Sequence, residues 1–291
     1  MKRLSCKIVA QNVLLRVKKD TELFIEKEHR APGLAVVLVG NNPASESYVR
    51  QKTIKAEEMG FVHFQYTLSE DCKEEELLAL IDDLNNDEAI DGILVQLPLP
   101  ISIDEKKIIN AISPEKDVDG FTEINTGRLC IGEDCIVPCT PAGIMEILSY
   151  YKIETKGKNV TIIGRSNIVG KPMAMLLIRK GIDATVSICH SKTVDLKEYT
   201  LCADIIIVAT GSPNTIDSSF VKDGATVIDV GVNRIPDNTK EKGYRLVGDA
   251  NYNSFEERDV QITPVPGGVG LMTVAMLMAN TLEIAKARSM R

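Results

Sequence analysis

The chain has 291 residues, of which 44% are hydrophobic and 26% are charged, and its formal net charge is −7. This length and balance indicate one large or two moderate globular domains and argue against a disordered chain. The acidic net charge argues against a nucleic-acid partner. The first residues carry basic side chains but no long apolar core, so they do not resemble a secretory signal, and no apolar segment is long enough to span a membrane.

Seven cysteines, an odd number without a secretory signal, are typical of reduced thiols in a cytoplasmic protein. Cys130, Cys135 and Cys139 lie close together in the sequence, but their spacing matches no common zinc pattern and no fourth ligand lies nearby. We therefore expect no metal site.

The first half of the chain alternates between helices and buried strands. Amphipathic or capped patterns predict helices, and continuous apolar runs predict strands. The expected helices cover 8–29, 44–59, 73–86 and 104–112, and the expected strands cover 34–39, 61–66 and 92–97. Regular periodicity is lost over 120–138, which predicts a joint between two domains there.

The same alternation continues through the second half. Helices are expected over 141–151, 170–180 and 271–288, and strands over 159–163, 184–188, 204–209 and 225–230. Alternating β and α elements with continuous apolar strands predict an α/β fold with a parallel, doubly wound sheet.

A strand, a tight turn and a helix start are predicted over 160–173. The turn has the spacing Gly-x-Ser-x-x-x-Gly at Gly164, Ser166 and Gly170. Unpaired backbone N–H groups at such a helix start favour a phosphate. Many ordinary strand–helix turns also contain two glycines, so the spacing alone leaves both interpretations open.

The strand that follows ends in Cys189-His-Ser191-Lys-Thr193, where NAD-binding units usually carry a carboxylate for the ribose. This segment has no carboxylate, and Arg165 lies in the preceding turn. A carboxylate would repel a 2′-phosphate, whereas Arg165 and Ser191 can hold one. The sequence therefore favours NADP over NAD.

Several polar residues lie near the carboxyl ends of predicted strands, where α/β folds bind ligands. Tyr48 and Lys52 are four residues apart on a helix and share a face, either as an ordinary surface pair or as part of a site. Gln96 ends a strand and needs hydrogen-bond partners in the core or in a pocket. Of Asp117 and Asp119, one can form a turn while the other binds a ligand.

The segment Thr263-Pro-Val-Pro266-Gly-Gly-Val-Gly270 holds two prolines and three glycines. Its fixed backbone and missing side chains suit close approach to a ligand, but they also suit a connector between domains. In the helix after it, Met272, Met276 and Met278 are expected to pack in the core.

Together, six segments resemble the methylenetetrahydrofolate dehydrogenase/methenyltetrahydrofolate cyclohydrolase family. They follow the family's order and extend over most of the chain, at 39–52, 92–100, 114–120, 164–172, 189–193 and 263–270. Leu271 departs from the family, which commonly has proline before Met272, and Asp249-Ala-Asn251 departs from the usual pattern after Gly248. Both departures lie outside the expected chemistry but can alter the shape of the cofactor cleft.

The resemblance implies two domains: an N-terminal α/β substrate domain and a Rossmann-like doubly wound parallel sheet, with the C-terminal helix returning to the first domain. It places the folate-binding catalytic domain at 1–138 and 271–291 and the NADP-binding domain at 139–270. It also implies a cytoplasmic homodimer formed through the dinucleotide-binding domains.

The implied activity is NADP-dependent oxidation of 5,10-methylenetetrahydrofolate, followed by hydrolysis of the methenyl product to 10-formyltetrahydrofolate, in one-carbon metabolism and purine biosynthesis. By the same resemblance Lys52 is the catalytic lysine, Tyr48 and Gln96 are its neighbours, and Asp119 anchors the pterin. Neutral neighbours and partial desolvation would suit Lys52 for proton transfer, and Asp119 is expected to point away from its ammonium.

The remaining implied contacts fall into two sets. On the substrate side they are Leu97, Pro98, Pro266, Gly267 and Gly268. On the cofactor side they are Gly164, Arg165, Ser166, Val169, Gly170, His190, Ser191, Thr210, Gly211, Val230, Gly231, Val232 and Gly268.

Two rival functions remain open. One is a dehydrogenase of another small substrate, such as a shikimate-type or amino-acid enzyme, on a similar two-domain fold; failure to bind folate would favour it. The other is an inactive nucleotide-binding regulatory protein, whose mark would be the loss of Lys52 or Gln96, and both are present.

Overall fold

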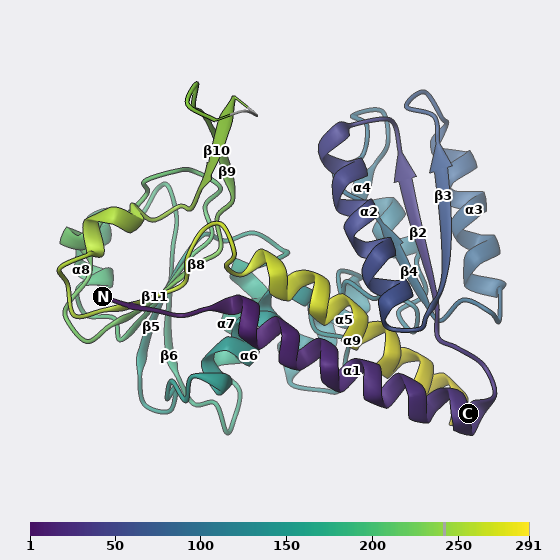
Figure 1. Cartoon of the computed structure of the whole chain (residues 1–291), viewed down its shortest axis with the longest axis horizontal. Coiled ribbons are helices and arrows are strands. Elements are labelled where there is room, and N and C mark those ends of the chain that lie inside the picture. The colour runs from purple at the N-terminus through teal and green to yellow at the C-terminus, as the bar shows by residue number, and fades with distance from the viewer. Residues whose placement is uncertain (241–242, 291) are drawn as a thin grey trace. The chain divides into compact units, whose positions relative to one another are not determined.

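The computed structural model of the protein describes residues 1–240 and 243–290, which separate into two compact units (Figure 1). The first, called the six-stranded unit below, comprises Met1–Ala10 and Thr140–Thr273. The second, called the three-stranded unit, comprises Gln11–Cys139 and the chain from Val274 onward.

The three-stranded unit is built on a parallel sheet with the order β3-β2-β4, formed by Val62–Leu68, Gly33–Val39 and Gly92–Val95. Every residue of β2 and β4 is buried, which explains their uninterrupted apolar sequences. Four helices belong to the same unit: α2 (Pro43–Glu58), α3 (Glu74–Asn86), α4 (Glu105–Ala111) and α5 (Glu123–Ile131). The α3 side chains Leu77, Ile81 and Leu84 are buried in the core next to this sheet.

Two long helices, α1 (Cys6–Glu28) and α9 (Gly270–Ser289), contribute most of their length to the three-stranded unit and lie side by side there (Figure 1). The fully buried carboxylate of Asp91 binds Arg30 at 2.7 and 3.0 Å and Arg288 of α9 at 3.2 Å. It also accepts the backbone N–H of Gly33 at 2.9 Å, at the start of β2. The expected return of the C-terminal helix to the first domain is therefore confirmed, and this ion cluster fastens it to the sheet.

The six-stranded unit contains a fully parallel sheet with the order β1-β11-β8-β7-β5-β6. Its strands are Lys2–Arg3, Gln261–Ile262, Thr226–Asp229, Ile205–Val208, Asn159–Ile163 and Thr185–Cys189. Its helices include α6 (Cys139–Tyr150), α7 (Gly170–Leu177) and α8 (Leu196–Thr200), with 3-10 turns η1 (Ser218–Phe220) and η2 (Tyr252–Phe255). The chain passes from β5 to β6 on one side and then to β7 on the other, so the switch point of this doubly wound sheet lies at β5.

A separate antiparallel hairpin joins β9 (Asn233–Pro236) to β10 (Tyr244–Val247) in the same unit, and it was not expected from the sequence. Its strands are short, with partly buried and exposed residues in both and no long apolar run. The Arg234 guanidinium lies 5.0 Å from the Tyr244 ring centre and joins the two strands.

The two units differ from the expected domains at the N-terminus of the chain. Residues 1–10 belong to the six-stranded unit, because β1 adds to its sheet beside β11 and the Lys2 N–H donates to Val260 O at 2.7 Å. The units divide at 139–140, next to the end of the expected joint at 120–138, although α5 lies within that region. Thr122 caps the start of α5, and Gly132 ends it in the left-handed conformation, with φ of 83°.

The other predicted helices and strands are present, with ends that differ by a few residues. Among the described residues, no helix is long and apolar enough to cross a membrane. Within that same part of the chain, no cluster of three or more His, Cys, Asp or Glu residues is arranged to hold a metal ion.

Candidate active site

Lys52 and Gln96 meet at the carboxyl edge of the three-stranded sheet. The Gln96 N–H donates to Val37 O at 2.8 Å, so the β-ladder holds this residue just past the end of β4. The Lys52 Nζ, from α2, donates to Gln96 Oε1 at 2.9 Å, and Gln96 Nε2 donates to Leu97 O at 2.6 Å. Because both ends of its amide are bound, Gln96 presents a fixed neutral acceptor to the lysine.

The loop before α5 separates the roles of its two carboxylates. Asp117 is buried and accepts the N–H groups of Phe121 and Thr122 at 3.2 and 2.9 Å and Asn125 Nδ2 at 3.0 Å. It is therefore the turn-forming residue of the pair. Asp119 takes no part in these three hydrogen bonds.

Asp119 lies in a partly buried position near Cys139. The Cys139 Sγ is 3.8 Å from Asp119 Oδ1 and 3.5 Å from Val118 O. Burial raises the pKa of Asp119 to about 6, while the Lys52 ammonium and the Cys139 thiol act to lower it. Burial also raises the pKa of Cys139, so this residue stays a neutral thiol.

The positive charge of Lys52 acts on both Asp119 and Cys139. The expectation that the Asp119 carboxylate points away from this ammonium stays a prediction. The amine and the carboxyl group therefore share one electrostatic environment, with Gln96 bound to the amine.

The other predicted substrate contacts of this unit are close to Lys52 or Gln96 in the sequence. Tyr48, one helical turn before Lys52, has 47% of its surface exposed. Leu97 is partly buried and Pro98 is exposed after β4, with a cis peptide bond between them. Tyr48 and Pro98 are thus accessible to a ligand.

In the six-stranded unit, the turn between β5 and α7 is compact. Ser166 Oγ accepts the N–H groups of Val169 and Gly170 at 3.2 and 3.4 Å. A Cβ on Gly170 would lie 2.2 Å from Gly164 O, so only glycine allows the helix to start this close to the strand end. Arg165 and Ser166 are exposed on this turn.

The turn after β6 is closed by its own polar side chains. Thr193 Oγ1 accepts the His190 N–H at 2.9 Å, and His190 Nδ1 accepts the Lys192 N–H at 3.2 Å. Ser191 is left exposed on this turn. An exposed hydroxyl and basic side chains without a carboxylate in either turn fit a dinucleotide that carries a 2′-phosphate.

Two buried aspartates bind three of the predicted cofactor residues that follow β7 and β8. Thr210 and Gly211 bind Asp249, and Gly231 binds Asp229. We did not assign either aspartate a role from the sequence, where Asp249 was noted only beside the altered pattern that follows Gly248. The sequence marks Asp229 only as an acidic residue at the end of an apolar strand, and Asp249 only as an acidic residue next to a glycine.

The remaining predicted contacts, Pro266, Gly267 and Gly268, lie just before α9 in the six-stranded unit. Pro266 and Gly267 are exposed, and Gly268 is buried. The peptide bond between Val265 and Pro266 is cis, and Gly267 has a φ of 87°. The segment is thus a tightly turned piece of backbone with few side-chain atoms.

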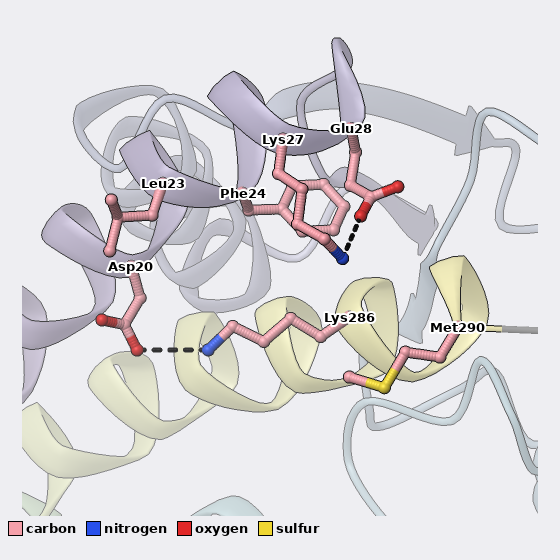
Figure 2. Close-up of a pocket in the computed structure, with 7 residues that line it drawn as sticks. All are labelled: Asp20, Leu23, Phe24, Lys27, Glu28, Lys286 and Met290. Atoms are coloured by element: carbon pink, nitrogen blue, oxygen red, sulfur yellow. Dashed lines mark hydrogen bonds and ion pairs between the residues drawn. The ribbon is translucent and has the colours of Figure 1, made fainter.

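A cavity elsewhere in the three-stranded unit lies beside α1 and the end of α9 (Figure 2). Figure 2 shows Lys286 paired with Asp20 and Lys27 paired with Glu28 at its rim, at 3.1 and 2.7 Å. Its seven lining residues are Asp20, Leu23, Phe24, Lys27, Glu28, Lys286 and Met290. None of these carries a predicted catalytic or binding role, so the cavity is separate from the candidate site.

Comparison with known proteins agrees with this arrangement. The tetrahydrofolate dehydrogenase/cyclohydrolase catalytic domain matches residues 4–119, and the NAD(P)-binding domain of the same family matches residues 138–289. The chain belongs to this family. The resemblance drawn from the six sequence segments is thereby confirmed.

Individual relatives in the family match over nearly their whole length. The bifunctional protein FolD of Streptococcus mutans is 51% identical over 96% of this chain and 95% of its own. The crystal structure of the bifunctional FolD dehydrogenase/cyclohydrolase from Campylobacter jejuni has a TM-score of 0.93 at 46% identity, covering 99% of each chain. The Trypanosoma brucei enzyme, solved with NADP cofactor and an inhibitor, has a TM-score of 0.93 at 39% identity, covering 99% of this chain and 98% of its own.

Proposed function

We propose that this protein oxidises 5,10-methylenetetrahydrofolate with NADP and hydrolyses the 5,10-methenyl product to 10-formyltetrahydrofolate. The observation that carries the proposal is the Lys52–Gln96 hydrogen bond in the same electrostatic environment as Asp119, in a chain of the dehydrogenase/cyclohydrolase family. A reactive amine, a neutral amide and a carboxyl group suit a substrate that is a pterin with a one-carbon bridge.

The six-stranded unit would hold the cofactor. The β5–α7 turn, with Gly164, Ser166 and Gly170, would take the pyrophosphate at the start of α7. Arg165 and Ser191 would bind the 2′-phosphate, and the turns after β7 and β8 would support the other half of the molecule. When bound, NADP supplies a hydride acceptor for the first reaction.

Lys52 would act in the hydrolysis. Water must add to a cationic amidine-like carbon and lose a proton, and the Lys52 amine is the basic group at this edge of the sheet. Gln96 accepts one N–H of the lysine and fixes where Nζ lies, leaving its other positions for the substrate or a water molecule. General acid–base catalysis of this kind contributes about 10²–10⁴-fold to a rate.

Asp119 would anchor the substrate rather than move the proton. Its carboxylate suits the paired N–H donors of the aminopyrimidinone ring of a pterin. Asp117 supports it indirectly by closing the loop on the backbone of Phe121 and Thr122. Tyr48, Leu97 and Pro98 would complete the substrate side in this unit.

The protein would act as a cytoplasmic homodimer formed through the six-stranded units. The support for this is the family resemblance, together with the seven cysteines, which form no disulfide in the part of the chain that the structure describes. Light scattering coupled to size-exclusion chromatography would test it. A monomer at micromolar concentration would contradict the dimer.

One assay tests the activity. Purified protein is given methylenetetrahydrofolate with NADP or with NAD, and the methenyl absorbance is followed over time. We expect methenyl to appear with NADP and then to decay faster than in protein-free buffer. No methenyl formation, combined with oxidation of shikimate or an amino acid, would favour the rival dehydrogenase instead.

A further inference from the structure

Asp249 links its own segment to two other segments at the carboxyl edge of the six-stranded sheet. Its Oδ2 accepts the N–H groups of Thr210 and Gly211 at 2.6 and 2.9 Å and lies 3.0 Å from Thr210 Oγ1. Its Oδ1 accepts Asn233 Nδ2 at 2.8 Å, at the start of β9. The residue is fully buried, so these donors replace water around the carboxylate.

A second buried carboxylate completes the connection. Asp229, at the end of β8, accepts the N–H groups of Gly231, Asp249 and Ala250 at 3.0, 2.9 and 3.0 Å. A Cβ on Gly231 would lie 2.0 Å from Asp249 Oδ1, so a side chain there would displace the carboxylate. Asp229 and Asp249 thus link the turn after β7, the turn after β8 and the start of β9. This pair of aspartates is called the aspartate hub below.

The position of the hub in the sheet indicates which half of a dinucleotide it supports. Ligands of doubly wound sheets cross the switch point at the carboxyl edge, which lies here at β5. The 2′-phosphate side chains follow β5 and β6, so the adenosine half lies on the β6 side. The nicotinamide half then lies on the β7 and β8 side, over the turns that the hub holds.

We propose that Asp249, paired with Asp229, is a positioning residue that fixes the turns after β7 and β8 for the nicotinamide half of the cofactor. This inference rests on the proposed function, because it requires that the unit binds NADP. The hub acts through backbone atoms of Thr210, Gly211 and Gly231 and does not touch the ligand itself.

The Asn233 contact offers a sharp way to break and repair the hub. Asn233→Asp replaces the amide donor with a carboxylate that faces Asp249 Oδ1 at hydrogen-bond distance, and the repulsion should displace Asp249 from Thr210 and Gly211. In the double variant Asn233→Asp/Asp249→Asn, the new amide at position 249 can donate to the new carboxylate at position 233, while the amide oxygen still accepts from Thr210 and Gly211. The double variant thus restores the hydrogen bonds, with the negative charge at position 233 instead of position 249.

Binding is measured by calorimetry with two probes, NADP⁺ and adenosine 2′,5′-bisphosphate, which lacks the nicotinamide half. We expect Asn233→Asp to weaken NADP⁺ binding about 10- to 100-fold and to change binding of the bisphosphate less than about threefold. The double variant should regain most of the NADP⁺ affinity, a coupling that independent sites would not show.

Equal weakening of the binding of both probes would overturn the proposal, because it would indicate that the whole unit had become less ordered. Unchanged NADP⁺ binding in Asn233→Asp would also overturn it, as would a double variant that does not regain NADP⁺ affinity. If Asn233→Asp does not fold, Asp249→Asn alone carries the test, with an expected loss of about three- to tenfold for NADP⁺ only. A wild-type protein that binds neither probe would instead contradict the proposed function.

Discussion

The carboxyl edges of the two sheets use charged side chains in opposite ways. In the three-stranded unit, Lys52 and Asp119 are partly accessible and are available to a ligand, while neutral Gln96 holds the lysine in place. In the six-stranded unit, Asp229 and Asp249 are buried behind the turns and bind backbone N–H groups. There the two aspartates hold Thr210, Gly211 and Gly231 by their backbone N–H groups.

This difference follows from what each unit is proposed to do. Proton transfer and pterin recognition require charged groups in contact with the substrate. A dinucleotide is bound largely by backbone N–H groups, whose positions must be fixed from the protein side. Carboxylates facing a bound phosphate would repel it, whereas the same groups placed behind the backbone stabilise the turns.

The largest effect should come from removing the proposed catalytic lysine. We expect Lys52→Met to lower cyclohydrolase kcat about 10²- to 10⁴-fold while part of the dehydrogenase activity remains, because only the hydrolysis needs the proton role of the lysine. Both rates can be measured in one stopped-flow experiment on methenyl absorbance.

Lys55→Met is the matched control for this variant. Lys55 lies on the same helix but pairs with Glu58 at 2.5 Å on the surface, so its loss should change neither rate appreciably. Full cyclohydrolase turnover in Lys52→Met would remove this lysine from the mechanism.

Arg165 sharpens the comparison, since it is an exposed charge in the β5–α7 turn of the six-stranded unit. We expect Arg165→Ala to raise KM for NADP about 10- to 100-fold and to leave KM for NAD nearly unchanged, because only NADP carries the 2′-phosphate. Lys180→Ala, another exposed basic residue of this unit, serves as the control. Equal effects of Arg165→Ala on both cofactors would refute the 2′-phosphate role.

The smallest effect concerns the pH dependence of substrate binding. Because burial raises the pKa of Asp119 to about 6, its carboxylate forms as the pH rises through that value. The dehydrogenase kcat/KM for the folate substrate should therefore increase between about pH 5 and 7. A profile without an inflection in this range would contradict an anionic anchor.

Cys139→Ala tests the cause of that profile. The thiol helps to lower the pKa of Asp119, so its removal should move the inflection to higher pH. At pH 8, where the carboxylate is formed in both proteins, kcat/KM should differ by less than about twofold. An inflection that moves downward would show that the thiol does not stabilise the carboxylate.

The parts predicted from the sequence are those with local signals. The apolar runs of β2, β4 and β5 and the glycines of the β5–α7 turn can be read directly, because each depends on neighbouring residues. The pairing of β1 with β11 could not be predicted, since two residues carry no periodicity and their partner lies far along the chain. The α5 helix was missed although Thr122 and Gly132 mark its ends.

The residues of the candidate site also differ in whether the sequence could predict them. Lys52, Gln96 and Asp119 were found through the family resemblance and from their places near predicted strand ends. The aspartate hub was not found, because its meaning depends on Asp229 and Asp249 reaching the same turns from separate strands. Buried carboxylates that bind backbone leave no characteristic spacing in a sequence.

The Asp91 cluster has a consequence for the order in which the protein forms during synthesis. Arg30 has already been made when Asp91 leaves the ribosome, but Arg288 follows 197 residues later. We expect residues 11–139 to remain sensitive to protease until α9 has been added, and protection in a chain that stops at residue 273 would contradict this. The unit that holds the proposed catalytic lysine is mostly translated before the six-stranded unit, yet we expect it to be the second to complete its fold.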